Sequence, residues 1–295
     1  MEKHKSIEKS IEKSIIDKDF DRNFDINYEI GFINGIQFGI YSPEIILKKS
    51  VVNINVETLY DSNDEPKING LFDPRMGYIV PRGICKTCEQ TYILCPGHFG
   101  HIELPKPVFN LQFETWILKI LKCICIKCSR LLINKNHQIF KNILTNTKGN
   151  YKDRFEKILK FCSNVKICGS SDKKDDLRYD NGGCGAIQPS KYNSKLKTDY
   201  IIIAEWKYDS GDNPINIAQE LNAEIIYALF KRITDDDALV MGFNSKWCMP
   251  AWLIITVLPV VPPSVRPSVR QYNSQRSEDD LTNSYYTIIK NCKSL

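Results

Sequence analysis

The chain has 295 residues, of which 42% are hydrophobic and 25% are charged, which is enough for one or two folded domains. Its formal net charge of +5 counts every cysteine as neutral, so charge alone does not indicate a nucleic-acid-binding protein. The longest apolar run, residues 251–261, is too short for a membrane span, and the first residues are polar and charged, unlike a signal peptide. The cysteine count of 11 is odd and includes CxxC pairs, which favours metal binding in a reducing compartment over a disulfide framework.

Residues 1–33 have the composition of a low-complexity extension. The tetrapeptide Lys-Ser-Ile-Glu occupies residues 5–8 and 9–12 and begins again at residue 13. We expect this extension to be solvated and partly helical. After it, residues 36–52 predict a strand that leads into a helix, with Ser42 as the N-cap and Pro43 in the first turn.

The next segment, residues 53–110, looks loop-rich and contains the clearest ligand pattern in the chain. Two pairs, each with two residues between its members, are separated by six residues: Cys85, Cys88, Cys95 and His98. Such pairs fold both side chains onto one ion, and zinc with four protein ligands is typical of a structural site. His101 is a spare imidazole three residues further on.

A second pair, Cys125 and Cys128, predicts another site of the same kind. Its remaining two ligands must come from three candidates further along the chain: Cys162, Cys168 and Cys184. Cys162 lies on an apolar helical stripe, which favours a place in the core. Cys123, two residues before the pair, is expected to face away from the metal.

Apolar patterns predict the remaining elements. Helical spacing recurs in three segments: 113–121, 155–162 and 225–233. Thr234 then starts a short helix with acidic residues in its first turn. Apolar runs at residues 200–206 and 252–258 predict two buried strands. The predicted class is therefore an irregular α+β fold.

The last part of the chain combines arginines with a final helix. Three arginines precede Glu278, and their guanidinium groups suit phosphate oxygens: Arg266, Arg270 and Arg276. Ser277 can cap a helix, with Asp280 three residues later. The apolar residues of this helix follow the spacing of a heptad seam, which favours a partner helix: Leu281, Tyr285, Ile288, Cys292 and Leu295. We expect the chain to end inside this element.

Several segments together resemble a known family. They are residues 70–77 (GLFDPRMG), 95–101 (CPGHFGH), 181–189 (NGGCGAIQP), 258–268 (LPVVPPSVRPS) and 276–282 (RSEDDLT). In this order they resemble the amino-terminal clamp of the largest subunit of multisubunit DNA-directed RNA polymerase, of the eukaryotic polymerase II type. The resemblance runs from about residue 36 to residue 295, with Val261 where the family usually has proline.

This resemblance implies a zinc-stapled clamp that is incomplete at its carboxyl end. Residues 34–112 would form the first part of the clamp core with zinc site 1, and residues 113–230 the clamp head with zinc site 2. Residues 231–295 would form the second part of the core, with the lid and the start of a coiled-coil helix. The resemblance also implies that Cys168 and Cys184 complete the second site. Seven thiolates and two structural Zn²⁺ ions would lower the net charge from +5 to about +2.

The function implied is DNA-templated transcription, with the clamp holding DNA and the RNA–DNA hybrid in the cleft of a nucleotidyltransferase. The lid, residues 268–280, would help to part the transcript from the template, and the three arginines would contact nucleic acid. The implied partners are the second-largest subunit and the remaining segments of the largest subunit. The family's aspartate motif, NADFDGD, does not occur in this sequence. Mg²⁺ therefore belongs to the complete enzyme, and no catalytic residue is expected in this chain.

Two alternative functions use the same ligands. A RING-like zinc adaptor also binds two ions through Cys and His, but six residues between Cys88 and Cys95 are few for its cross-braced pattern. A free-standing zinc module for single-stranded nucleic acid would bind alone, with a steep dependence on salt. Abundant Ile, Lys and Asn predict an intracellular protein of a large DNA virus, acting in the viral factory or virion. A nuclear protein of a cellular eukaryote is the second choice, and no membrane association is expected.

Overall fold

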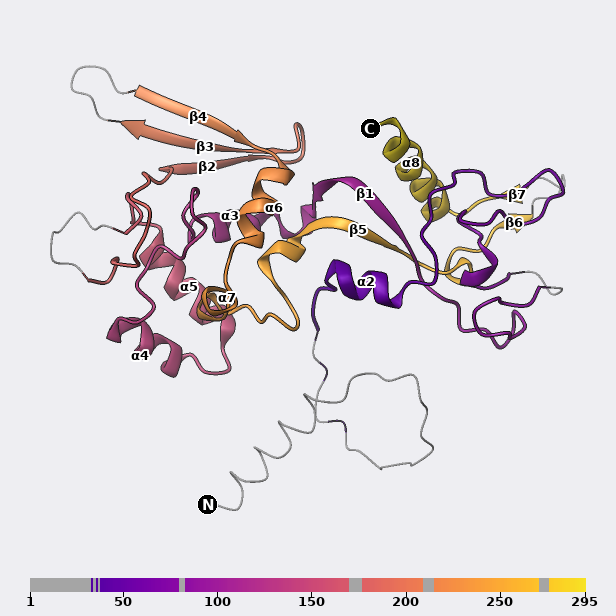
Figure 1. Cartoon of the computed structure of the whole chain (residues 1–295), viewed down its shortest axis with the longest axis horizontal. Coiled ribbons are helices and arrows are strands. Elements are labelled where there is room, and N and C mark those ends of the chain that lie inside the picture. The colour runs from indigo at the N-terminus through magenta and orange to yellow at the C-terminus, as the bar shows by residue number, and fades with distance from the viewer. Residues whose placement is uncertain are drawn as a thin grey trace, which may run out of the picture. The chain divides into compact units, whose positions relative to one another are not determined.

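The computed structural model describes residues 33, 36, 38–79, 83–169, 177–208, 215–270 and 276–295 (Figure 1). The chain divides into two compact units, Met1–Phe38 and Gly39–Leu295. The predicted low-complexity extension belongs to the first unit and lies almost entirely outside the described residues. The second unit contains the described helices and strands, and none of these helices is both long and apolar enough to cross a membrane.

The described elements form a mixed fold with small sheets, which confirms the α+β prediction at this level. The α-helices are α2 (Pro43–Lys49), α3 (Glu114–Leu121), α4 (Gln138–Asn146), α5 (Tyr151–Cys162), α6 (Ala223–Lys231), α7 (Asp235–Met241) and α8 (Asp280–Ser294). Short 3-10 helices are η1 (Pro74–Met76), η2 (Leu111–Phe113), η3 (Pro250–Leu253) and η4 (Pro263–Val265). The strands are β1 (Gly100–Phe109), β2 (Lys191–Lys195), β3 (Ile201–Tyr208), β4 (Ile215–Leu221), β5 (Ile254–Val260), β6 (Val269–Arg270) and β7 (Arg276–Ser277).

Capping side chains fix where several helices begin. Ser42 and Thr234 each accept a hydrogen bond from the amide three residues on, at 3.1 and 3.2 Å, which confirms both predicted N-caps. The strand predicted before α2 is not formed in residues 36 and 38–42 as described. The predicted cap of the last helix is also wrong. Ser277 lies in β7, and Asp279 caps α8 because it stands directly before the first helical residue.

A long two-stranded ribbon of β1 and β5 passes through the second unit (Figure 1). The strands pair antiparallel, and the register shifts between Glu103 and Val108. Residues 104–107 there stand opposite a single residue of β5. Two of them, Pro105 and Pro107, cannot donate to a neighbouring strand, which explains why the ladder bulges at this place.

The second sheet is antiparallel with the order β2-β3-β4. Its central strand, β3, contains most of the apolar run that predicted a strand at residues 200–206. Ile202 and Ala204 are buried on the core face, whereas residues 216–220 of β4 are exposed. The third sheet is the short hairpin of β6 and β7.

Two hydrophobic clusters form the interior of the second unit. The larger cluster includes buried residues of α3, α5, α6 and β3, and the smaller one joins residues between 52 and 102 to residues 260 and 289. The β1–β5 ribbon belongs to both, because Phe109 and Ile254 lie in the larger cluster and Ile102 and Val260 in the smaller. The ribbon therefore joins the two cores covalently and by hydrogen bonds.

Helix α8 packs on the smaller cluster through a face that follows the predicted heptad seam only in part. Three seam residues pack against this cluster: Tyr285, Ile288 and Cys292. The two ends of the seam, Leu281 and Leu295, are 47% and 73% exposed. The fully buried side chains are instead Thr282 and Ile289. The middle of the seam thus packs against a cluster formed by strands, loops and the 3-10 helix η1 of the same chain.

Candidate metal centres

The structure brings the predicted ligands together in two groups of four. Site 1 consists of Cys85, Cys88, Cys95 and His98, and site 2 of Cys125, Cys128, Cys168 and Cys184. In each group the ligand atoms all lie within 4.8 Å of one another. Sulfur ligands about 2.3 Å from zinc define a tetrahedron with edges of about 3.8 Å. Both groups therefore have the size of a tetrahedral zinc site.

The two CxxC pairs share one local backbone conformation. In site 1 the Cys85 amide donates to the carbonyl of the residue five positions later at 3.0 Å, and Glu89 has a φ of 56°. In site 2 the Cys125 amide makes the equivalent hydrogen bond at 2.8 Å, and Ser129 has a φ of 61°. A left-handed residue directly after the second cysteine reverses the chain, so both thiols of a pair turn toward the same point.

Backbone amides are directed at the sulfurs of site 1. The amide of Thr87 lies 3.4 Å from Sγ of Cys85, and the amide of Gly97 lies 3.4 Å from Sγ of Cys95. Such donors stabilise a thiolate relative to a thiol. Sγ of Cys95 is also 3.6 Å from Nε2 of His98, close to a tetrahedral edge.

The 3-10 helix η1 supports both halves of site 1. The Arg75 carbonyl accepts hydrogen bonds from the Thr87 hydroxyl at 2.7 Å and from the Cys85 thiol at 3.7 Å. The Met76 carbonyl accepts one from the His98 amide at 3.0 Å. The two ligand pairs are therefore bonded to one turn that precedes them in the chain.

His101, the spare imidazole, lies outside site 1. Its Nδ1 is 2.7 Å from Oγ of Ser50, and its Nε2 is 3.5 Å from a carboxylate oxygen of Glu103. The first histidine of the CPGHFGH run, His98, is the one that the structure places among the site 1 cysteines.

Site 2 joins three separate segments of the chain. Sγ of Cys125 lies 3.6 Å from Sγ of Cys184, and Sγ of Cys128 lies 3.8 Å from Sγ of Cys168. These separations are far longer than a disulfide bond of about 2.05 Å and match a tetrahedral edge. Gly183 allows the segment before Cys184 to lie against Cys168, because a Cβ atom at position 183 would collide with the Cys168 sulfur.

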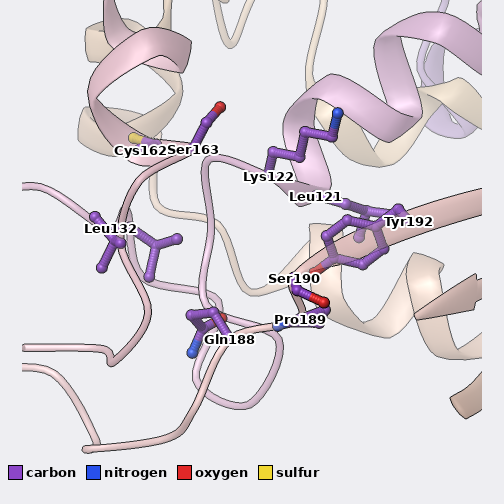
Figure 2. Close-up of a pocket in the computed structure, with 10 residues that line it drawn as sticks. Leu121, Lys122, Leu132, Cys162, Ser163, Gln188, Pro189, Ser190 and Tyr192 are labelled. Atoms are coloured by element: carbon purple, nitrogen blue, oxygen red, sulfur yellow. The ribbon is translucent and has the colours of Figure 1, made fainter. Parts of the chain in front are cut away.

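Cys162, the third candidate, is part of the core. It is 1% exposed at the end of α5 and lines a recess of about 210 Å³ together with Leu132 and Tyr192 (Figure 2). Burial, with a contribution from neighbouring Cys123, holds the pKa of its thiol well above the ordinary value. Neither Cys162 nor Cys123 belongs to the two ligand groups that the described residues form.

Gln188 supports site 2, a role that sequence reasoning missed. Its Nε2 donates to Sγ of Cys125 at 3.3 Å and to the Ala186 carbonyl at 2.8 Å, and its Oε1 accepts from the Ile126 amide at 3.0 Å. A donor next to a ligand sulfur stabilises its negative charge and fixes its direction. The signal in the sequence was its place in the family-like segment 181–189, four residues after Cys184.

In the metal-free protein the ligand groups titrate differently from one another. Burial raises the pKa of Cys95 to about 11, and it also raises the pKa of Cys125 and Cys168. For Cys184 burial acts upward, but a backbone amide and the neighbouring thiols outweigh it and lower the pKa to about 7. Burial lowers the pKa of His98, which favours the neutral imidazole that binds metals. A metal must therefore displace protons from most of these thiols.

Both donor sets fit zinc. Three cysteines with one histidine, and four cysteines, are sets that structural zinc uses. With four protein ligands, an ion at either site would have no position left for a catalytic water. An ion at site 1 would fix a loop that buries little apolar surface of its own, since Ile84, Ile93 and Leu94 are exposed there.

Comparisons with known proteins identify the family. The family model described as RNA polymerase Rpb1, domain 1, matches residues 30–295. The chain belongs to this family. DNA-directed RNA polymerase II subunit RPB1 of Euplotoides octocarinatus is 39% identical over 259 residues, which cover 88% of this chain and 52% of the relative. This Rpb1 domain 1 chain thus spans about half the length of that curated relative.

Arg266 is buried inside this Rpb1 domain 1 chain, with an exposure of 0%. Its guanidinium donates to the Val261 carbonyl at 3.0 Å, to the Thr282 hydroxyl at 3.1 Å and to the Leu71 carbonyl. Burial lowers its pKa to about 10, so the group stays charged at neutral pH. The prediction that Arg266 contacts nucleic acid is therefore wrong for this structure, because its donors are used within the chain and cannot reach a phosphate.

Arg270 and Arg276 face each other in the ladder of β6 and β7. The hairpin corresponds to the predicted lid, and its tip, residues 271–275, lies outside the described residues. For Arg270 and Arg276 the structure describes the backbone and not the side chains. The structure thus places their backbones opposite each other at the base of the hairpin, and contact with nucleic acid remains a prediction.

Proposed function

We propose that the chain forms the amino-terminal clamp portion of the largest subunit of a DNA-directed RNA polymerase. The observation that carries this proposal is the match of the Rpb1 domain 1 family to residues 30–295. In this role the chain acts in DNA-templated transcription and helps to hold DNA and the RNA–DNA hybrid in the cleft. The chain would be part of a nucleotidyltransferase without supplying catalytic residues, because the aspartates and their Mg²⁺ would come from the rest of the enzyme.

Sites 1 and 2 would each hold a structural Zn²⁺ in this proposal. The larger hydrophobic cluster, with site 2 on it, would correspond to the clamp head of residues 113–230. The smaller cluster draws on residues before and after the larger one, which supports a clamp core in two parts, residues 34–112 and 231–295. The larger cluster extends to Ile254, so the later boundary of the head would be less sharp than the predicted residue 230.

The proposed partners are the second-largest polymerase subunit, the remaining segments of the largest subunit, template DNA and the RNA–DNA hybrid. The chain would act in the nucleus if its source is cellular, and in the viral factory if its source is the large DNA virus that the composition predicts. A RING-like adaptor is not favoured, because site 1 uses four successive ligands whereas a cross-braced pair interleaves them. The family match also leaves no need for that alternative.

The lid can be tested in a reconstituted polymerase that contains this chain. Replacing Arg270 and Arg276 with alanine should impair separation of the transcript from the template more than it impairs addition of a single nucleotide. Arg232→Ala is the matched control, since Arg232 is an exposed arginine at the end of α6. An equal loss of nucleotide addition and transcript separation would argue against a lid at this position.

A further inference from the structure

The turn after β5 lies between site 1 and helix α8. Gly97, in the ligand loop of site 1, approaches this turn so closely that a Cβ atom would come 2.7 Å from Cβ of Pro262 and 2.9 Å from Oγ of Ser264. The turn is closed by η4, after which the Arg266 amide donates to the carbonyl three residues before it at 3.1 Å. A displacement of the ligand loop would therefore displace the segment that carries Arg266.

The side chain of Arg266 reaches from this turn to α8. Its Nε donates to the carbonyl of Val261 at 3.0 Å, and one terminal nitrogen donates to the hydroxyl of Thr282, in the first turn of α8, at 3.1 Å. Its guanidinium carbon lies 5.2 Å from the ring centre of Phe72 and 5.9 Å from that of Tyr285. Both distances allow a cation–π interaction, so α8 is held by a charged group that water does not reach.

A second connection leads from Arg266 back to site 1. Its other terminal nitrogen donates to the Leu71 carbonyl, two residues before the cap of η1 at Asp73. Helix η1 accepts hydrogen bonds from both ligand pairs of site 1. Arg266 is therefore connected to site 1 through the 262–264 turn on one side and through η1 on the other.

We propose that Arg266 is a positioning residue that couples metal binding at site 1 to the position of α8. This coupling rests on the proposed occupation of site 1 by a metal. The coupling is reciprocal by thermodynamic necessity. If the bound metal stabilises the contact with α8, loss of that contact lowers the affinity of site 1 for the metal. Site 2, whose ligands Cys125 and Cys168 lie in the larger cluster, serves as an internal reference.

The test is a chelator titration of the zinc-loaded chain of 295 residues. Brief cysteine alkylation followed by peptide mass spectrometry reports the occupancy of each site separately. Arg266→Met keeps an unbranched side chain and removes the guanidinium group that donates the hydrogen bonds. We expect site 1 to lose half of its zinc at a chelator concentration about 5- to 150-fold lower, the range of typical coupling free energies, with site 2 unchanged.

A matched control and a milder variant accompany this change. Arg154 is also a buried arginine with three intrachain acceptors, but it lies on the larger cluster, so Arg154→Met should leave site 1 unchanged. Thr282→Val keeps the shape of the side chain and removes only the acceptor on α8. It should shift site 1 in the same direction by a smaller factor. In the converse experiment, Cys88→Ser should accelerate hydrogen exchange of the α8 amides and leave those of α3 unchanged.

Three outcomes would overturn the proposal. If both sites lose zinc at equally lowered chelator concentrations, Arg266 only contributes to general stability. If site 1 of the folded Arg266→Met and Thr282→Val chains loses zinc at the same concentration as in the unaltered chain, the coupling is refuted while the metal site stands. If the unaltered chain binds no zinc at site 1, the proposed metal site itself fails and the coupling fails with it. These outcomes are distinct because the first two still show zinc at site 1 of the unaltered chain.

Discussion

Replacing Gln188 with glutamate tests the support of site 2 with little change of shape. The variant keeps an oxygen where Oε1 accepts from the Ile126 amide at 3.0 Å. It removes the NH₂ group that donates to Sγ of Cys125 at 3.3 Å and to the Ala186 carbonyl at 2.8 Å. A carboxylate oxygen would then face a ligand thiolate, so a favourable contact becomes a repulsive one.

The size of the effect follows from the lost hydrogen bond. A hydrogen bond to a charged group contributes about 1.5–3 kcal/mol. Each change of about 1.4 kcal/mol alters a dissociation constant tenfold. We therefore expect Gln188→Glu to weaken zinc binding at site 2 by about 10- to 100-fold, which is the range found when an outer partner of a metal ligand is changed.

Site-resolved chelator competition, read by alkylation of the ligand cysteines of each site, measures this change. Gln112→Glu makes the same change of charge at an exposed residue of η2 and should leave both sites as they are. If Gln188→Glu binds zinc at site 2 as tightly as the unaltered chain, the hydrogen bond to Cys125 does not stabilise the site. The reasoning from its geometry would then be refuted.

Metal analysis should give two zinc ions per unaltered chain, one in Cys128→Ser and two in Cys162→Ser. Loss of an ion in Cys162→Ser would mean that Cys162 is a ligand of site 2. Zinc binding at site 1 should strengthen as the pH rises from about 6 to 8, because thiols such as Cys95, with a pKa of about 11, must release protons to the solvent when the ion binds. A dissociation constant that does not change with pH would contradict thiolate ligation. Gly97→Ala should lower the free energy of unfolding by about 1–2 kcal/mol for its left-handed backbone and by about 1–3 kcal/mol more for overpacking. Gly149→Ala is the control in thermal or chemical unfolding, because Gly149 has a φ of +84°, close to the +81° of Gly97, but open space beside it. Equal losses of unfolding free energy in the two variants would mean that the turn facing Gly97 adjusts without cost.

Local structure could be predicted from the sequence wherever short-range chemistry decides it. Ser42 and Thr234 cap their helices because a hydroxyl satisfies an amide within one turn, whatever the rest of the chain does. Site 1 could be predicted for the same reason. All four of its ligands lie within residues 85–98, and the spacing alone brings them to one point.

Long-range contacts could not be predicted in this way. Site 2 takes its second pair from segments that follow Cys128 by 40 residues or more, and spacing alone could not choose between Cys162 and Cys168. The family resemblance indicated Cys168. In the fold both cysteines are buried at 1% exposure, but only the sulfur of Cys168 lies beside the CxxC pair, 3.8 Å from that of Cys128. The pairing of β1 with β5 likewise joins strands that no local pattern relates.

Arg266 shows why a wrong residue was included among the predicted contacts to nucleic acid. Arginines are rarely fully buried, so Arg266 was expected to be exposed. Its burial depends on acceptors from distant parts of the chain, because Leu71 lies 195 positions away and Thr282 lies 16 positions away. Only the assembled fold brings these acceptors together.

Helix α8 buries a face that only partly matches the one its apolar spacing predicts, and Arg266 accounts for the burial of Thr282. Apolar spacing omits Thr282, which is 1% exposed. A buried hydroxyl without a partner costs about 1–3 kcal/mol, but here it accepts a hydrogen bond from Arg266, so the cost is removed for both groups. The helix therefore turns Thr282 and Ile289 inward and leaves Leu281 47% exposed. The covered face of α8 is therefore set by the acceptor that one buried charge requires as well as by the apolar residues Tyr285, Ile288 and Ile289.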